Sequence, residues 1–318
     1  MYPDIISLGE LLVEIMREGI DVPHGKIGEI YKGPYPSGAP AIFIDSVARM
    51  AKPFNFSTGL LGTVGNDEFG ECIINKLKID GVDISQIIIL DNYTTGIAFN
   101  QYSSDGSRKF IFASGAAGKI FPEKINEKYF SNVKALHIMG SALSISKSSR
   151  ESCYKAIEFA KRINPNVIIS FDPNLRSEML DLKKILEFSE PVLKNTVILL
   201  PSGEEAEMLA GVKGAVNACI NLLDQGPKII VLKQGEDGCM IFTHKIKEGL
   251  KVSGFKVKEI DPTGAGDSFG GAFIVGYLAG WSLSKTAKFA NTVGALKVQH
   301  FGPMPDTTYE EVEMFMKH

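Results

Sequence analysis

Short apolar runs alternate with helical patterns along most of the chain. The runs are almost continuously apolar, as in strands that a parallel sheet buries on both faces. Between them, apolar residues recur at three- and four-residue steps, which is typical of amphipathic helices. The predicted strands are residues 4–8, 57–64, 135–139, 167–171, 197–200 and 229–232, and the predicted helices are residues 41–50, 67–79, 147–162, 181–194 and 203–223. This order indicates an α/β fold with a mostly parallel central sheet flanked by helices.

Two segments, 13–35 and 88–112, break this rhythm, since they alternate polar and apolar residues and carry turn signals without a helical pattern. In the second, Asp105-Gly106 separates two such runs and predicts a β-hairpin. We expect these segments to form a small, discontinuous β-sheet that projects from the main domain. A sheet with one face to bury should cover a cleft, pair with another subunit, or both. The α/β core would then comprise residues 1–12, 36–87 and 113–318.

Composition and charge limit the classes of function that this protein could have. The 318 residues are 44% hydrophobic, and the net charge of −3 provides no positive excess for a polyanion, so nucleic-acid binding is excluded as the main function. The longest uncharged apolar stretch, 268–284, falls short of the roughly 20 residues that span a bilayer. We therefore expect no membrane partner, no signal peptide and a cytoplasmic location. The scattered cysteines and histidines form no zinc-binding pattern, and we expect free thiols.

The segment from Asp261 to Phe273 (DPTGAGDSFGGAF) carries the most chemical information. A strand over 252–260 is predicted before it and a helix from about residue 266 to 278 after it. The small residues Gly264, Ala265 and Gly266 allow a tight turn, and their amide N–H groups at the helix N-terminus suit an anion such as phosphate. Asp267 would stand beside this anion hole and could accept a proton from a hydroxyl, the combination that phosphoryl transfer needs. The alternative is a helix cap without catalytic function.

This run resembles the C-terminal signature of the ribokinase-like carbohydrate kinases, the PfkB family. The resemblance extends along the chain. The other matching elements are Gly62–Gly70 (GTVGNDEFG), Asp172–Arg176 (DPNLR), the turn Lys233–Gly238 (KQGEDG), Asn291 near the adenine position, and the closing turn Gly302-Pro-Met-Pro.

The resemblance implies a sugar kinase that uses ATP and Mg²⁺. In such an enzyme Asp267 is the catalytic base, and Gly264, Ala265 and Gly266 with the Asp267 amide form the anion hole. The small sheet corresponds to the family's lid, which implies closure over the sugar and a homodimer. The implied nucleotide-binding residues are Lys233, Gly235, Gly238, Thr263, Asn291 and Ser202, and the implied sugar-binding residues are Glu14, Gly38, Asp172, Asn174, Arg176 and Asp267.

Two metal sites follow from the same resemblance. Glu205 matches a glutamate that orders the water around Mg²⁺, although Ser202 replaces the family's asparagine. A monovalent cation, K⁺, is implied beside the anion hole, where it would add a positive field. Its expected site comprises Asp261, Thr263 and the backbone carbonyls around Lys297, His300 and Gly302.

The choice of sugar depends on departures from the family pattern. Ser37-Gly38 replaces a Gly-Gly pair, and Ile42 replaces an asparagine. Arg176 could contact the carboxylate of a sugar acid, whereas Arg108 and Lys109 could be a second cationic contact or exposed charges. Because residues 37–41 resemble fructokinases, we expect fructose phosphorylated to fructose 6-phosphate. The alternatives are a 2-keto-3-deoxygluconate kinase, another sugar or nucleoside kinase, and a non-catalytic sugar or nucleotide sensor.

Overall fold

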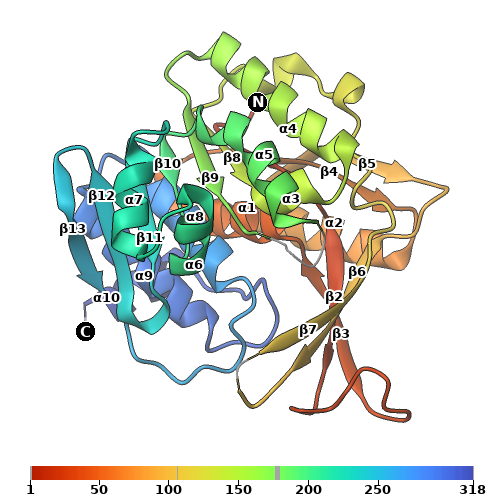
Figure 1. The fold of residues 1–318 in the computed structure, drawn as a ribbon. Helices are drawn as coiled ribbons and strands as arrows, with labels where there is room; N and C mark the ends of the chain where they lie inside the picture. The colour runs from red at the N-terminus through yellow and green to blue at the C-terminus, as the bar shows by residue number, and fades with distance from the viewer. Residues whose placement is uncertain (1, 106, 176–179, 318) are drawn as a thin grey trace.

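The computed structural model describes residues 2–105, 107–175 and 180–317, which fold into a large sheet covered by helices and a smaller separate sheet (Figure 1). The large sheet has the order β13-β12-β11-β10-β9-β8-β1-β4-β5. Its strands are β1 (Ile5–Leu8), β4 (Thr58–Gly65), β5 (Val82–Leu90), β8 (Ala135–Met139), β9 (Ile168–Asp172), β10 (Ile198–Leu199), β11 (Ile229–Lys233), β12 (Gly238–Thr243) and β13 (Ile246–Ser253).

Neighbouring strands from β5 to β11 pair in parallel, and only the hairpin of β12 and β13 adds antiparallel pairs. Helices cover both faces of this sheet (Figure 1). They are α1 (Ala39–Met50), α2 (Glu68–Asp80), α3 (Gly140–Ser144), α4 (Lys147–Ile163), α5 (Leu182–Leu193), α6 (Gly203–Ala210), α7 (Ala215–Leu223), α8 (Ala265–Leu278), α9 (Leu283–Lys297) and α10 (Tyr309–Met316). The predicted α/β class, with a mostly parallel central sheet, is confirmed.

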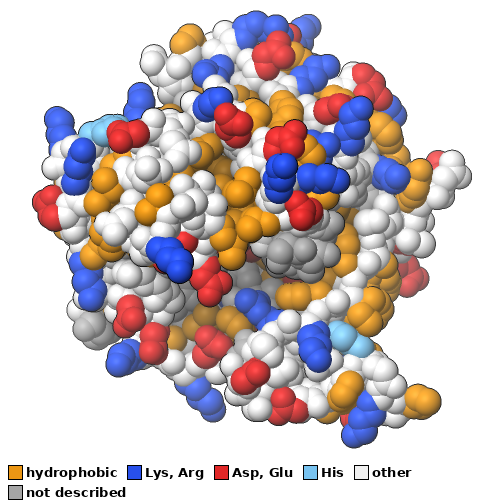
Figure 2. Space-filling model, in the orientation of Figure 1, with side chains coloured by type: hydrophobic (Ala, Val, Ile, Leu, Met, Phe, Trp, Pro, Cys, Tyr) orange, Lys and Arg blue, Asp and Glu red, His pale blue; other side chains and the backbone are white. Residues whose placement is uncertain are grey.

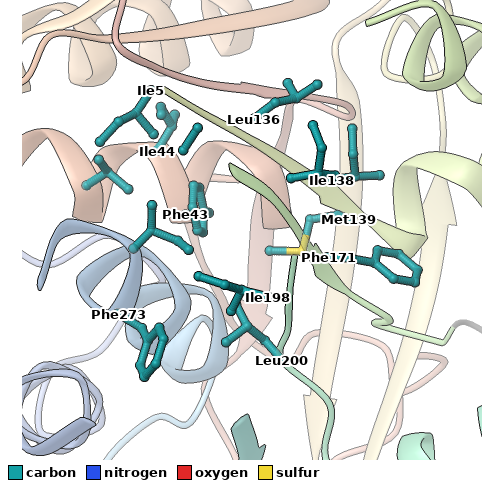
Figure 3. Packing of buried hydrophobic residues seen from close by; sticks show 14 of the residues in the cluster. Ile5, Phe43, Ile44, Leu136, Ile138, Met139, Phe171, Ile198, Leu200 and Phe273 are labelled. Atoms are coloured by element: carbon teal, nitrogen blue, oxygen red, sulfur yellow. The ribbon is translucent and has the colours of Figure 1, made fainter. Parts of the chain in front are cut away.

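Helices α1 and α8 pack against the sheet in one part of the core (Figure 3), and the buried cluster also includes residues of α4, α5 and α7. Phe43 of α1 and Phe273 of α8 are fully buried, and the Phe43 ring stacks on His137 of β8 with ring centroids 3.6 Å apart. All residues of β1, β4 and β8 are buried, which accounts for their continuous apolar runs. No helix in the described part of the chain is long and apolar enough to cross a bilayer.

The small sheet has the order β3-β2-β6-β7 and projects from the main body (Figure 1). Figure 2 shows a hollow between this sheet and the larger domain, with charged side chains around its rim. The sheet starts at Leu12, one residue before the predicted boundary, whereas residues 88–90 end β5 of the large sheet instead of belonging to the lid. Its strands are β2 (Leu12–Arg17), β3 (Tyr31–Ser37), β6 (Gly96–Tyr102) and β7 (Arg108–Ala113).

Two predicted elements differ from the structure. The helix expected over 203–223 is two helices, because Gly211 adopts a left-handed conformation that ends α6 and Gly214 precedes α7. The strand expected over 252–260 was wrong beyond Ser253, where β13 ends. Its alternating pattern has a different cause, since Phe255, Val257 and Glu259 line a cavity instead of pairing in a sheet.

Asp67 joins the two sheets at the start of α2. Its Oδ1 accepts hydrogen bonds from the Gly70 amide (2.9 Å) and the Thr95 hydroxyl, and its Oδ2 accepts one from the Thr95 amide (2.7 Å). Thr95 immediately precedes β6, so this carboxylate caps a helix of the core and anchors a strand of the small sheet. Burial acts to raise the pKa of Asp67, but these hydrogen bonds lower it overall.

Asp67→Ala is expected to lower the free energy of unfolding by about 1–2 kcal/mol at neutral pH, because the cap is lost. Since the folded pKa is depressed, this stabilisation exists above the ordinary value of 3.8 and disappears as the pH falls through the folded value. Denaturant unfolding of both proteins at neutral and acidic pH checks this. Equal stability at neutral pH, or a gap that persists in strong acid, would contradict it.

Candidate active site

The polar residues at the ends of three parallel strands meet at one edge of the large sheet, where α/β folds bind their ligands. Asp172 ends β9, Ser202 follows β10 and Lys233 ends β11. The Lys233 ammonium forms an ion pair with Asp172 Oδ2, and Asp172 is only 2% exposed. Asp172 Oδ1 accepts a hydrogen bond from the Asn174 amide (3.2 Å). The carboxylate thus holds the Lys233 side chain in place.

The N-terminus of α8, where the anion hole is expected, lies beside this pair. Gly264 has φ 80°, and a Cβ there would lie 3.0 Å from Ile42 Cγ2 and from the Pro303 carbonyl oxygen. The turn therefore requires glycine. Ile42, at the position of the family's asparagine, is buried beneath this turn as a packing residue. Asp267 is half-buried in the first turn of the helix.

The Lys233 ammonium lies close to the amide groups of this turn. A Cβ built on Gly266 would lie 3.4 Å from Lys233 Nζ. Burial acts to lower the pKa of Lys233, but Asp172, Glu205 and Asp267 raise it overall, so the ammonium stays protonated. A protonated lysine beside the N–H groups of a helix N-terminus suits the binding of a phosphate group.

A cavity of about 300 Å³ opens next to the anion hole. Its size is at the lower end of the range for small-molecule sites, and its walls are mainly glycine and apolar side chains. Asn291 lines it and donates hydrogen bonds to the Val252 and Ser253 carbonyls (3.1 Å each), which tie α9 to the end of β13. Of the residues expected to bind nucleotide, the cavity wall includes Lys233, Gly235, Gly238 and Asn291, together with Ala265 and Gly266 of the anion hole.

Ser202 and Glu205 form a capping box at the start of α6. Glu205 Oε2 accepts a hydrogen bond from the Ser202 amide (2.8 Å), and Oε1 accepts one from the Leu175 amide (3.1 Å). Ser202 lies outside the cavity wall, although it forms a parallel bridge with Lys233. Each Glu205 oxygen has a second lone pair, so the carboxylate can still bind metal-bound water.

Polar residues of the small sheet form a buried hydrogen-bonded group around Glu14. Glu14 of β2 is buried, with Oε1 accepting from the Ser37 hydroxyl (2.6 Å) and Oε2 from the Asn100 amide group. Gly38 has φ 111° directly before α1, and a Cβ there would lie 2.2 Å from the Glu10 carbonyl oxygen. The sequence analysis noted Ser37 only as a departure from the family's Gly-Gly pair, and it missed Asn100, whose only signal was the alternation of its strand.

Asp261 connects the small sheet to the anion-hole turn. Its Oδ1 accepts hydrogen bonds from the Thr263 amide and the Tyr102 hydroxyl (2.9 Å each), and its Oδ2 accepts one from the Gly302 amide (2.8 Å). The Tyr102 hydroxyl also contacts Thr263 Oγ1. Tyr102 ends β6, and no local pattern predicted this contact across 159 positions.

The residues expected to bind K⁺ do not fit a metal ion as they stand. The buried ammonium of Lys297 donates hydrogen bonds to the Asp261 carbonyl (2.7 Å) and the His300 carbonyl (3.4 Å). It also lies 3.6 Å from Asp261 Oδ2. Across the described ranges, no group of three or more His, Cys, Asp and Glu side chains is arranged to hold a metal. Arg176 and Gly106 lie outside the described residues.

Comparison with known proteins decides the family. The model of the pfkB family of carbohydrate kinases matches residues 45–308. The chain belongs to this family. It is 31% identical to 5-dehydro-2-deoxygluconokinase of Clostridium perfringens, over 99% of this chain and 93% of that protein. A protein of Arabidopsis thaliana provisionally called fructokinase-5 is 30% identical over 95% of this chain and 94% of its own length.

Among solved structures, an E. coli protein provisionally called Ribokinase II, crystallised with ATP and Mg²⁺, has a TM-score of 0.90. It is 38% identical, and the match covers 99% of both chains. The predicted ribokinase-like fold and family are therefore confirmed. This pfkB kinase is a phosphotransferase that acts on a sugar hydroxyl.

Proposed function

We propose that this kinase transfers the γ-phosphoryl group of ATP to the primary hydroxyl of a ketohexose, with fructose as the first candidate. The observation that carries the proposal is the convergence of the α8 N-terminus, the Lys233 ammonium and Asp267 next to a cavity of nucleotide type. Amide and ammonium groups stabilise the charge of the transferring group, and a carboxylate accepts the proton of the attacking hydroxyl. A binding module would not need that base.

In this mechanism the sugar hydroxyl loses its proton to Asp267 as its oxygen forms a bond to the γ-phosphorus. The bond from that phosphorus to ADP breaks, and the electron pair stays on ADP. The amides of residues 264–267 and Lys233 hold the phosphoryl oxygens throughout. Closure of the small sheet over the hollow would exclude water, which otherwise competes as the acceptor.

Magnesium would neutralise charge on the ATP phosphates when bound. The E. coli relative was crystallised with ATP and Mg²⁺, which supports the same pair of ligands for this chain. Of the residues here, Glu205 would hold Mg²⁺ through water, since both of its oxygens keep a free lone pair after capping α6.

Fructose is favoured by the neutral and acidic polar groups that the small sheet turns toward the hollow. Glu14 and Asn100 are bonded to each other, and Tyr102 lies on the same face of β6 as Asn100. Such groups donate to and accept from hydroxyls without requiring a negative charge on the sugar. The fructokinase-type relative from Arabidopsis agrees with this choice.

A sugar acid such as 5-dehydro-2-deoxygluconate is the second candidate, and the register of β7 favours it. Arg108 pairs with Tyr102 and therefore shares the face of Tyr102 and Asn100. Lys109 pairs with Gln101 on the opposite face. Arg108 is thus a cation at the edge of the proposed sugar site that could bind a carboxylate. The Clostridium relatives, which are named 5-dehydro-2-deoxygluconokinase, support a sugar acid as the substrate.

A panel of acceptors with coupled ADP detection tests the proposal. We expect turnover with fructose above that with 5-dehydro-2-deoxygluconate, 2-keto-3-deoxygluconate, ribose and adenosine. A higher kcat/KM for either sugar acid would replace fructose by the second candidate. Absence of turnover with every acceptor, together with intact ATP binding, would favour a non-catalytic sensor.

Arg108→Ala and Lys109→Ala form a matched pair for the second candidate. If a sugar acid is the substrate, Arg108→Ala should raise its KM about tenfold, the loss of one exposed charge-assisted hydrogen bond. Lys109→Ala should leave KM unchanged, because this side chain lies on the other face. With fructose, neither variant should change KM. Equal effects of both variants would exclude a specific contact by Arg108.

The proposal also includes a homodimer formed through the small sheet, and a cytoplasmic location. Large apolar side chains are exposed on this sheet and on the loops that extend it, among them Ile20, Ile27, Ile30 and Ile111. Exposed apolar surface of this kind suits a protein interface. Sedimentation of the wild type and of an Ile111→Glu variant tests the dimer, which the variant should weaken.

A further inference from the structure

We propose that Lys297 is a built-in cation that replaces the monovalent metal ion expected beside the anion hole, so that this kinase works without K⁺. The inference concerns the phosphate-binding turn and does not depend on which sugar is the substrate. It starts from the position of a single buried ammonium group at the end of α9.

The Lys297 side chain is 1% exposed, and its ammonium reaches the groups that a metal ion would need. It donates hydrogen bonds to the Asp261 carbonyl at 2.7 Å and to the His300 carbonyl at 3.4 Å. Asp261 and His300 are two of the residues expected around K⁺. A metal ion and the ammonium would need the same position beside these carbonyls, and two cations cannot occupy it together.

The Lys297 ammonium also faces the carboxylate of Asp261. Asp261 Oδ2 lies 3.6 Å from Lys297 Nζ. Burial acts to raise the pKa of Asp261, but Lys297 and the Thr263 and Gly302 amides lower it overall, so the carboxylate is ionised. Burial lowers the pKa of Lys297 overall, although Asp261, Glu14 and Glu259 act in the opposite direction. A buried carboxylate requires a partner cation, and Lys297 provides it.

The ammonium acts on the anion hole through Asp261. That carboxylate holds the Thr263 amide (2.9 Å) immediately before Gly264, where the turn into α8 begins. The carbonyl that Lys297 binds belongs to the same residue. Lys297 is therefore a positioning residue, which orders the turn and adds positive field near the phosphate-binding amides.

The first test uses the wild-type protein. ADP affinity by calorimetry, thermal unfolding and kcat are measured in KCl and in choline chloride at equal ionic strength. We expect ADP affinity and kcat in the two salts to agree within about twofold, and the unfolding temperatures to agree within the measurement error. The reason is that Lys297 already occupies the proposed cation position. An increase of more than about fivefold in ADP affinity or kcat with K⁺ would overturn the inference.

The second test compares two truncations of the same side chain. Lys297→Ala leaves room beside the two carbonyls, so ADP affinity should fall about tenfold in choline chloride and recover in KCl or NH₄Cl. Lys297→Met fills that room with an uncharged side chain, so no cation can enter. Its loss of ADP affinity should therefore persist in every salt. Lys288→Ala, at an exposed position on the same helix, should behave as the wild type.

The outcomes separate this inference from the proposed sugar. A folded Lys297→Ala protein that no cation restores, or a Lys297→Met protein with wild-type ADP affinity, would overturn it. If Lys297→Ala does not fold, Lys297→Met still decides by its ADP affinity. Absence of turnover with all sugars would refute the proposed substrate and leave the salt dependence of ADP binding interpretable.

Discussion

Replacing Asp267 with asparagine is expected to lower kcat by about two to four orders of magnitude, the usual scale for a positioned acid–base group. Asparagine keeps the size of the side chain and its place in the first turn of α8, but it cannot accept the proton of the sugar hydroxyl. The anion hole consists of backbone amides and Lys233, which the substitution does not remove. Binding of ATP should therefore stay near the wild-type level.

The measurement is kcat by coupled ADP detection, with ATP affinity by calorimetry on the same samples. Asp224→Asn is the matched control, because Asp224 is exposed and lies far along the chain from the anion-hole turn. It should keep full activity. Near-normal turnover of Asp267→Asn would show that another group removes the proton. Loss of ATP binding in step with kcat would instead give Asp267 a role in nucleotide binding.

Lys233→Met is expected to produce the second-largest effect. Removal of one preorganised donor from a transition-state site costs about two to three orders of magnitude in kcat. The substitution also leaves Asp172 buried without its cation, which costs about 3–5 kcal/mol of stability for a broken buried pair. The double variant Lys233→Met/Asp172→Asn removes the uncompensated charge and should regain much of that stability.

These two variants separate catalysis from folding. We expect the double variant to unfold near the wild-type temperature and to keep the low kcat of Lys233→Met. Lys228→Met, at an exposed position just before β11, is the matched control and should be unaffected. Recovery of kcat in the double variant would mean that Lys233 serves only to neutralise Asp172.

The turn that carries the proposed anion-hole amides could be located from the sequence because residues 264–267 are contiguous. Glycine at 264, the small residue at 266 and the acid at 267 are required by one turn into one helix, and the local sequence contains all of that information. The strand ends that carry Asp172 and Lys233 were also predictable, since apolar runs mark buried parallel strands and ligands gather at their carboxyl ends.

Contacts between distant segments could not be predicted in the same way. Tyr102 reaches Asp261 only because the small sheet folds over the turn, and no local pattern encodes that approach. Lys297 illustrates the same limit. Its position in the family pattern suggested a backbone carbonyl as a ligand, whereas its side chain turns inward and occupies the space beside Asp261. Only the packing of α9 against the turn reveals the difference.

The sequence pattern led to a wrong prediction where a strand and a cavity-lining segment look alike. Residues 255–259 were expected to continue a strand, but they lie beyond the end of β13, and Phe255, Val257 and Glu259 line the cavity next to α8. Gly211 and Gly214 are local signals for the break between α6 and α7. The apolar pattern continues on both sides of them, and for that reason a single helix was predicted.

The central claim is that the amides at the start of α8 bind the transferring phosphoryl group while Asp267 faces the sugar hydroxyl. A crystal structure with fructose, Mg²⁺ and a non-hydrolysable ATP analogue tests it most directly. The account predicts γ-phosphate oxygens within hydrogen-bonding distance of the amides of residues 264–267 and an Asp267 oxygen beside the acceptor hydroxyl. A γ-phosphate bound elsewhere, with Asp267 directed away from the sugar, would contradict it.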